Sequence, residues 1–422
     1  MTERADVVIA GAGAAGLMAA IFAGRTARER GGNTRIFALD GAKRIGAKIL
    51  ISGGGRCNVT HERVEPTDFH GNRNSIAKIL RSLSVAETRD FFESLGVRLK
   101  REDTGKLFPI SDRAATVLDA LLGGVREAGV EIRPATRVLT VRPHAGAFHV
   151  GTSAGVISCT RVILSTGGQS VPKTGSDGFG YEMVSALGHS VTPVFPALVP
   201  LLLPANHWAK RIKGVSCMVA LSLRGDNGRL LERVDGSMLM THFGISGPAV
   251  LDMSRHWVAQ QRIRQGSVLD VSFLPGKTLE DLEREWLDLT KRNPRSTAVS
   301  IVGRWLPDRL AEAIVTEEAR VDGSTMLSRL DRDSRKRLLR ALTATTLPVT
   351  GDRGFDYAEV TAGGVPLNEV STSTMESRIA PGLFVCGEIL DVDGRIGGFN
   401  FQWAWATGRL AGIAAVRGIG EG

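Results

Sequence analysis

Six residues near the amino end, Gly11-Ala12-Gly13-Ala14-Ala15-Gly16, have the spacing of a phosphate-binding loop. In such a loop the first glycine permits a tight turn, the second lets the backbone approach a pyrophosphate, and the third lets helix and strand pack closely. The helix N-terminus then offers free N–H groups and a positive dipole end to the phosphates. Asp40, 24 positions after Gly16, is suited to binding a ribose hydroxyl. The loop and Asp40 therefore predict a dinucleotide site.

A second group of polar and glycine residues runs from Lys48 to Asn58. Three consecutive glycines, Gly53 to Gly55, follow Ser52 and expose backbone N–H groups in a nest that suits an anion or a flavin carbonyl. Arg56 could hold charge on a phosphate or on a reduced flavin, and Asn58 offers a donor and an acceptor to the isoalloxazine edge. Cys57 is expected to be a packed residue rather than a nucleophile.

Three later segments bring the chain back towards the same ligand. A strand that runs into Thr166-Gly167-Gly168 resembles the turn with which two-dinucleotide flavoproteins pass the cofactor again. A strand that ends in Gly387-Glu388 resembles the Gly-acid pair that bonds the ribityl chain, although the acid there is usually Asp. Gly397-Gly398-Phe399-Asn400 opens the last helix, whose dipole can stabilise a reduced flavin; the aromatic residues themselves favour packing.

Together these motifs predict that the dinucleotide is FAD. The residues assigned to FAD are Gly11, Gly13, Ala14, Ala15, Gly16, Asp40, Lys48, Ser52, Gly53, Gly54, Gly55, Arg56, Asn58, Val138, Thr166, Gly167, Gly168, Gly387, Glu388, Gly397, Gly398, Phe399 and Asn400. There is no second strand–GxGxxG–helix unit, so NAD(P)H is expected only as a transient reductant. The stretch 358–365 either lines the flavin or turns the chain.

A proton donor is less evident. His242, in the polar and glycine-rich loop 241–248, is either a catalytic acid or an ordinary hydrogen-bonding residue. The catalytic candidates are therefore His242, Arg56 and Asn58. The four cysteines are scattered without a CxxC pair, which predicts neither a dithiol centre nor a metal site and fits a reducing cytoplasm.

The elements that position these residues alternate between strand and helix. Strands are predicted over 6–10 and 35–39 with a helix over 17–30 between them. A helical stretch over 75–95, with Ser84 and Glu87 as a capping box, and a helix over 111–128 come next. Further strands are expected over 130–132, 137–141, 148–151 and 156–164. This alternation is typical of an α/β fold with an open sheet.

The pattern changes in the second half of the chain. Residues 191–275 are β-rich, with a hairpin at Asp226-Asn227-Gly228, and residues 279–344 are helical. A strand over 383–386 and a helix over 402–416 close the chain. We therefore predict a nucleotide domain of residues 1–190 and 345–422, split by a β-rich part (191–277) and a helical part (278–344).

Charge is unevenly distributed. The chain has 422 residues and a formal charge of +9, and residues 191–344 hold 23 Lys and Arg against 17 Asp and Glu. The basic segment 329–340 is either a solvated helix face or a surface that contacts phosphates. No apolar run has the length of about 18 residues that a membrane span needs, and residues 5–23 lack a signal-peptide pattern. We expect a cytoplasmic protein; the sequence does not set an oligomeric state.

The five motifs, in this order, resemble the BaiN/RdsA (YhiN-like) family of bacterial flavoproteins, from Gly11 to Gly412. The most specific segments are Ser52–Asn58, Thr241–Pro248 and Glu388–Asn400. The resemblance implies a Rossmann-like FAD domain split by an insertion with a β-barrel-like part and a small helical part. His61 departs from the family, which commonly has Asn after the Val-Thr pair.

Three activities remain open. Family members are similar to 23S ribosomal RNA dihydrouridine synthases, bile-acid enone reductases or aminoacetone oxidases. The first two would reduce a conjugated C=C, and an RNA uridine is favoured because the excess positive charge lies mostly in the insertion. The alternatives are a flavin oxidase acting on a small amine and a flavin-bearing RNA-binding protein without turnover.

Overall fold

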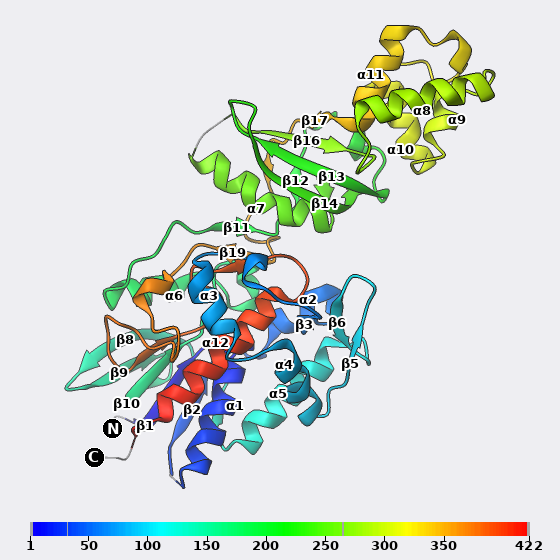
Figure 1. Ribbon diagram of the computed structural model, residues 1–422. Coiled ribbons are helices and arrows are strands. Elements are labelled where there is room, and N and C mark those ends of the chain that lie inside the picture. Colours follow the sequence, from blue (N-terminus) through cyan, green and yellow to red (C-terminus); the bar gives the residue numbers. More distant parts are fainter. Residues whose placement is uncertain (1–2, 32, 264–265, 420–422) are drawn as a thin grey trace. The chain divides into compact units, whose positions relative to one another are not determined.

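The computed structural model describes residues 3–31, 33–263 and 266–419 (Figure 1). The chain divides into two compact units, Met1–Pro196 with Glu359–Gly422 and Ala197–Ala358. The predicted boundaries at 190, 277 and 345 stay predictions of the domain organisation. In the part of the chain that is described, no helix has both the length and the apolar character to cross a membrane.

The first unit is built on a mixed sheet in the order β7-β2-β1-β10-β9-β8, and β20 also pairs with β10. The strands β1, β2, β7, β10 and β20 are parallel, whereas β8 and β9 are antiparallel to their neighbours. Their bounds are β1 Glu3–Ala10, β2 Ile36–Leu39, β7 Glu131–Arg133, β8 Val138–His144, β9 Ala147–Thr152, β10 Gly155–Leu164 and β20 Leu383–Val385. The parallel Rossmann-like sheet of the predicted α/β fold is confirmed.

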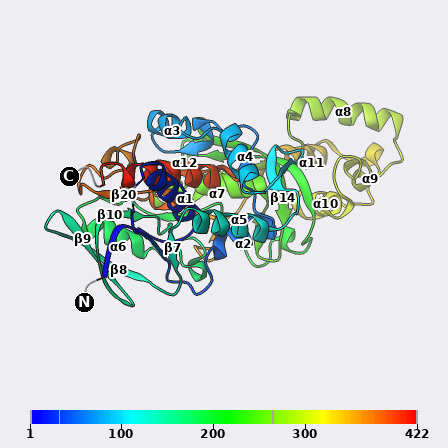
Figure 2. The same ribbon diagram turned by 90° about the horizontal axis from the view of Figure 1, so that it is seen from below.

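Two helices distant in sequence lie side by side on this sheet. Helix α1 (Ala14–Glu29) follows the glycine loop, and α12 (Phe399–Val416) packs along it (Figures 1 and 2). A Cβ added to Gly408 would lie 2.4 Å from the Ala15 carbonyl oxygen, and one at Gly412 would lie 2.3 Å from that of Ala19. Glycine is therefore required on α12 because the two backbones approach so closely.

The helical patterns predicted over 75–95 correspond to two helices, α3 and α4. Helix α3 ends at Leu80, and α4 begins at Val85 after Ser84 caps it: Glu87 N–H donates to Ser84 Oγ at 3.2 Å, and Ser84 N–H donates to the Glu87 carboxylate at 2.7 Å. The capping box thus starts a new helix instead of lying inside one. The remaining helices of this unit are α2 Ala47–Gly55, α3 Arg73–Leu80, α4 Val85–Ser94, α5 Ala114–Glu127 and α6 Phe179–Ala186.

Short strands complete the first unit. They form a three-stranded sheet in the order β3-β6-β5 and two pairs, β21–β4 and β11–β19. Their bounds are β3 Thr60–His61, β4 Phe69–His70, β5 Leu99–Arg101, β6 Lys106–Pro109, β11 Phe195–Ala197, β19 Val360–Ala362 and β21 Asp393–Gly394.

The second unit holds an antiparallel sheet in the order β17-β16-β13-β14-β15-β12-β18. The end strands β17 and β18 are separated by only three residues in the sequence. The two edges of the sheet must therefore lie close together, as they do in a barrel-like sheet. The strands are β12 Leu201–Leu202, β13 Ser216–Arg224, β14 Leu230–Met240, β15 Gly244–Ser246, β16 Val268–Ser272, β17 Thr345–Leu347 and β18 Gly351–Asp352. The predicted hairpin turn at 226–228 joins β13 to β14.

One helix of this unit is absent from the predictions. Helix α7 (Pro248–Ile263) packs against β14 and β13, and its residues Val250, Met253 and Trp257 are buried. Its pattern is obscured because Gly247-Pro248 resembles a loop, although proline is favoured in the first turn of a helix.

The helical part of the second unit is confirmed. Its helices are α8 Leu279–Arg292, α9 Ala298–Val302, α10 Asp308–Ala313 and α11 Arg332–Thr343. Helix α11 is amphipathic: Leu338, Leu339 and Leu342 are buried, and α11 packs against α8.

Candidate functional site

The glycine loop joins β1 to α1. A side chain at Gly11 or Gly16 would collide with neighbouring backbone, whereas Gly13 faces open space. Gly11 has a φ of +99°, and a Cβ added there would lie 2.5 Å from the Ser165 carbonyl oxygen; a Cβ on Gly16 would lie 1.9 Å from the Gly11 carbonyl oxygen. By contrast, a Cβ on Gly13 would meet no atom within 4 Å. No side chain caps α1, and its first turn holds no acid. The N–H groups of Ala14 and Ala15 therefore begin a helix whose positive end suits a pyrophosphate.

Asp40 braces this loop from the end of β2. Its Oδ2 accepts a hydrogen bond from Ala12 N–H at 2.9 Å, and its Oδ1 accepts one from Ala42 N–H at 2.8 Å. Each carboxylate oxygen keeps a further lone pair, so the predicted ribose contact is chemically open. Val138, also assigned to the cofactor, is buried at the start of β8.

Glu388 is held by residues from three separate segments. Lys48 Nζ donates to its Oε2 at 2.5 Å, and its Oε1 accepts from Ser170 Oγ at 2.7 Å and from Thr361 N–H at 3.0 Å. Lys48 also donates to Ser170 Oγ at 2.5 Å. Sequence reasoning missed Ser170, and it left open whether the stretch with Thr361 lines the flavin. The predicted ribityl contact of Glu388 stays a prediction, and the structure adds a bracing role.

The Thr166-Gly167-Gly168 turn belongs to the same network. A Cβ on Gly168 would lie 2.5 Å from Thr361 Oγ1 and 2.9 Å from Glu388 Oε1, so glycine is needed where these segments meet. Thr166 Oγ1 is buried and has no hydrogen-bond partner within the described part of the chain. An orphaned hydroxyl of this kind is costly unless a ligand or water satisfies it.

The predicted glycine nest is a left-handed turn at the end of α2. Ser52 is extended, and Gly53, Gly54 and Gly55 have φ values of +55°, +68° and +83°. Cys57 N–H closes the turn on the Ser52 carbonyl at 3.0 Å. Cys57 is fully buried, and desolvation raises the pKa of its thiol to about 12, so the thiolate needed for nucleophilic attack does not form near neutral pH.

Asn58, at the end of this turn, is the residue whose chemistry most clearly fits a bound cofactor. Asn58 is only 8% exposed, and its buried Oδ1 has no hydrogen-bond partner among the described residues. A ring N–H of a flavin is the type of donor that such an oxygen lacks. With the open space at Gly13 and the orphaned Thr166 hydroxyl, the residues of the first unit fit FAD.

Arg56 lies beside two carboxylates and an aromatic ring. Its Nη1 lies 2.5 Å from Glu102 Oε1 and 3.7 Å from Asp112 Oδ1, and its guanidinium carbon lies 4.0 Å from the Phe108 ring centroid. These carboxylates offset the charge on which its predicted roles with a phosphate or a reduced flavin depend. Those roles stay predictions.

The Gly397–Asn400 segment begins α12 as predicted. Gly397 and Gly398 have φ values of +136° and +95°, and no side chain caps the helix. The side chain of Asn400 accepts from Gly394 N–H at 2.8 Å and donates to the Gly394 carbonyl at 2.9 Å, which fixes the preceding turn. Phe399 is buried and packs against the His61 ring, with centroids 5.0 Å apart. Its packing role is therefore the one that the structure describes.

The three catalytic candidates are divided between the units. Arg56 and Asn58 belong to the first unit, whereas His242 belongs to the second. His242 is exposed in a turn that Thr241 closes, because Gly244 N–H donates to Thr241 Oγ1 at 3.1 Å. Its ring centroid lies 5.0 Å from that of Phe243. The roles of all three stay predictions.

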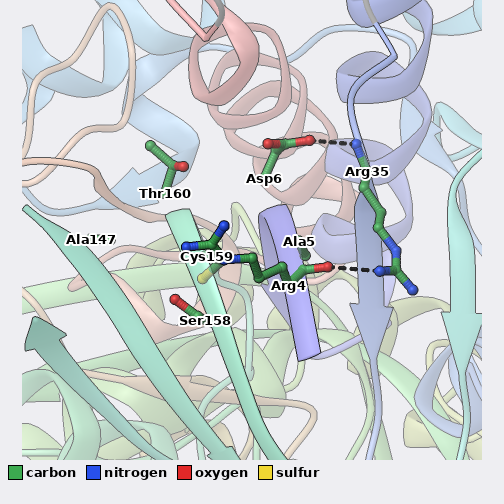
Figure 3. A pocket seen from close by; sticks show the side chains of 8 residues that line it. All are labelled: Arg4, Ala5, Asp6, Arg35, Ala147, Ser158, Cys159 and Thr160. Atoms are coloured by element: carbon green, nitrogen blue, oxygen red, sulfur yellow. Dashed lines mark hydrogen bonds between the residues drawn. The ribbon is translucent and has the colours of Figure 1, made fainter. Parts of the chain in front are cut away.

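A depression in the first unit lies away from these residues. It is lined by Arg4, Asp6, Arg35 and Cys159 among others, where Arg35 N–H donates to Asp6 at 2.7 Å (Figure 3). These residues flank the amino-terminal parts of β1 and β10, whereas the glycine loop follows the carboxyl end of β1. Nucleotides bind at the carboxyl ends of such strands, so this depression is not the cofactor site.

Among the described residues, no group of three or more His, Cys, Asp or Glu side chains could hold a metal ion. The cysteines Cys57, Cys159 and Cys386 are buried and Cys217 is half-buried; all four are free thiols.

Comparisons with known proteins agree with this geometry. The family model described as "HI0933-like protein Rossmann domain" matches residues 5–414. A 3-dehydro-bile acid delta(4,6)-reductase of Clostridium scindens is 36% identical over 408 residues, which is 96% of this chain and 98% of that protein. A ribosomal RNA dihydrouridine synthase of Escherichia coli is 33% identical over 410 residues, which is 96% of each chain.

A solved structure shares the fold over most of the chain. The open conformation of a flavocytochrome c3 fumarate reductase has a TM-score of 0.50 and 15% sequence identity, and the match covers 98% of this chain and 78% of the other. At that identity the likeness concerns the fold alone.

Proposed function

This chain belongs to the HI0933-like family of Rossmann-domain proteins and is an FAD-dependent oxidoreductase, and from that premise we propose that it reduces a uridine of 23S ribosomal RNA to dihydrouridine. We further propose NAD(P)H as a transient reductant, because the described residues contain one glycine-loop nucleotide unit, already assigned to FAD. Ribosomal RNA as substrate favours a cytoplasmic location.

The names of the two relatives share one reaction class. A delta(4,6)-reductase of a 3-dehydro-bile acid and a dihydrouridine synthase each saturate a C=C conjugated to a carbonyl. Bound FAD, once reduced by NAD(P)H, would supply the hydride for such a step. For uridine, the hydride adds to C6 and a proton adds to C5, so the two electrons of NAD(P)H are accounted for. The protein must therefore position the base and supply one proton, for which His242 is the candidate acid. Arg56 and Asn58 are candidates for holding charge and for contacting the flavin edge, not for donating the proton.

One observation favours RNA over a small substrate. Arg332, Lys336 and Arg340 follow one another at four-residue intervals along α11 and are all exposed. Among the described residues no hydrogen bond or ion pair involves their side chains, whereas Arg335 pairs with Glu283 at 3.5 Å. Like charges at this spacing repel within a helix, so the row is unfavourable without an anionic partner. A phosphate backbone would supply that partner.

The decisive measurement is nucleoside analysis of 23S ribosomal RNA from a strain that lacks this gene. We expect loss of dihydrouridine and its return when the wild-type gene is restored. The double variant Lys336→Gln/Arg340→Gln should restore several-fold less. A matched control, Arg284→Gln/Arg292→Gln, removes two charges that pair with Asp281 and Asp288 on α8, and it should restore the wild-type level. An unchanged dihydrouridine content in the deletion strain would refute the RNA substrate; peroxide release with small amines would then favour an oxidase.

A further inference from the structure

An arginine of the second unit lies between two aromatic rings beside the His242 turn. Strand β12 pairs with β15 on one side and with β18 on the other, so the segments that follow Met240 and Gly351 flank the same short strand. Leu203 N–H donates to the Phe243 carbonyl at 3.2 Å, and Arg353 N–H donates to the Pro200 carbonyl at 3.1 Å. The two segments are thereby fixed to opposite edges of β12.

The side chain of Arg353 lies across this strand. Its guanidinium carbon lies 4.2 Å from the Phe243 ring centroid and 3.3 Å from that of Tyr357. Both contacts are of the cation–π type, in which the flat faces of the guanidinium are covered while its N–H edge is not. Tyr357 is 51% exposed, so the site is open to solvent.

No acid neutralises this charge. In the described part of the chain, Arg353 has no carboxylate within ion-pair distance and its guanidinium makes no hydrogen bond. Three of the other arginines that lie over rings do have such partners: Arg56 pairs with Glu102, Arg133 with Glu3 and Arg137 with Asp177. Arg353 therefore keeps its N–H donors available for an external anion.

The backbone around Arg353 is also fixed. Gly354 N–H donates to Asp352 Oδ1 at 2.7 Å. The carboxylate that adjoins Arg353 in the sequence therefore already accepts a hydrogen bond from the backbone. Tyr357 N–H donates to the Gly354 carbonyl at 3.2 Å and fixes the backbone that carries the Tyr357 ring. A side chain ordered before binding loses less entropy when a ligand arrives.

We propose that Arg353, held by Phe243 and Tyr357, binds a phosphodiester group of the RNA substrate. This inference rests on the proposed function. The guanidinium edge matches two phosphate oxygens in a bidentate geometry, and the exposed His242 and Tyr357 rings beside it can contact the neighbouring nucleotide. The unpaired cations of α11 belong to the same unit, and they favour a polyanion over a single carboxylate.

The test measures binding of an in vitro transcribed 23S RNA fragment, which lacks dihydrouridine, to the FAD-loaded protein by fluorescence anisotropy over a range of KCl concentrations. We expect Arg353→Gln to weaken binding about tenfold and to reduce the slope of log K against log [KCl] by about 0.7 to 0.9, the value for one phosphate contact. Arg353→Lys should keep most of the slope and still lose affinity, because a lysine cannot bind two oxygens in a planar fork. The matched control is Arg224→Gln, which removes an arginine paired with Asp270 at 3.2 Å in the same unit.

Each outcome has one meaning. Wild-type protein that binds the RNA no better than an unrelated polyanion would refute the proposed function. Wild-type binding with the same affinity and slope for Arg353→Gln as for Arg224→Gln would overturn the phosphate site alone. A raised KM for NADPH with unchanged RNA binding would also overturn it, since the anion would then belong to the reductant. FAD content and thermal unfolding of each variant show whether it has folded.

Discussion

The first unit holds the cofactor site around the glycine loop, Asp40 and Glu388, which we call the cradle. The cradle and the Arg353 site of the second unit differ in whether their charged groups are paired within the protein. In the cradle, the Glu388 carboxylate accepts hydrogen bonds from Lys48, Ser170 and Thr361. The Asp40 carboxylate accepts hydrogen bonds from two backbone N–H groups. In the second unit, Arg353 has two aromatic neighbours and, as far as the described residues extend, no acidic partner. A carboxylate whose hydrogen bonds are made within the protein is held in place before any ligand binds. An unpaired guanidinium, by contrast, gains a partner for its charge only when an anion binds.

This difference corresponds to two kinds of ligand. A resident cofactor benefits from a cradle that is rigid in its absence, because less ordering is then lost on binding. A substrate that must leave after each turnover is better served by exposed charges whose interactions weaken with salt. If the cradle is ordered without FAD, substitutions in it should change the stability of the apoprotein and the affinity for FAD separately.

The largest effect is expected at Gly16. In Gly16→Ala the added Cβ would lie 1.9 Å from the Gly11 carbonyl oxygen, so strand and helix must separate. We expect a loss of about 3 kcal/mol in the free energy of unfolding and no bound FAD. Thermal unfolding of the apoprotein and flavin absorbance measure the two losses separately.

Gly13→Ala is the matched control for that experiment. Its Cβ meets no atom within 4 Å, and its φ of −79° suits any residue. The apoprotein should be as stable as the wild type while FAD binds more weakly, because the methyl group occupies space expected for the pyrophosphate. Equal destabilisation by Gly13→Ala and Gly16→Ala would contradict the description of the cradle.

An intermediate effect is expected at Glu388. Glu388→Gln leaves Lys48 without its anion in a half-buried position, and we expect a loss of about 2 kcal/mol in the free energy of unfolding of the apoprotein. Glu102→Gln, at the more exposed pair with Arg56, should cost less than about 1 kcal/mol. Urea denaturation compares the two. If they cost the same, Glu388 does not brace the cradle.

The smallest effect on stability is expected at Asn58. Asn58→Leu removes a buried oxygen that has no partner, so the unfolding free energy of the apoprotein should change by less than about 0.5 kcal/mol. The dissociation constant of FAD should still rise about tenfold, which corresponds to about 1.4 kcal/mol. Calorimetric titration of the apoprotein with FAD measures it. An unchanged affinity would show that Asn58 does not serve the flavin.

Local patterns were sufficient for much of the fold. The GxGxxG loop, the Ser84 capping box and the turn at 226–228 each depend on residues within a few positions of one another. The same local reading placed helical patterns over 75–95, where α3 and α4 lie. It missed α7, since Gly247-Pro248 hides the start of that helix.

The sites depend more on distant residues. Ser170 and Glu388 are 218 positions apart, and no periodicity links them. Phe243 reaches Arg353 only because β12, a strand of two residues, lies between β15 and β18. Strands that short carry no alternation in the sequence, so their pairing and the stack across them could not be predicted.

The paired strands β11 and β19 have a consequence for how such a protein can change. The chain leaves the first unit at Pro196 and returns at Glu359, and these crossings adjoin the two strands that pair with each other. Neighbouring entry and exit points are the arrangement in which a whole domain is inserted or replaced with least disturbance. Residues 197–358 can therefore be exchanged between relatives as one continuous segment, and the exchange would leave every residue of β1, β10 and β20 in place.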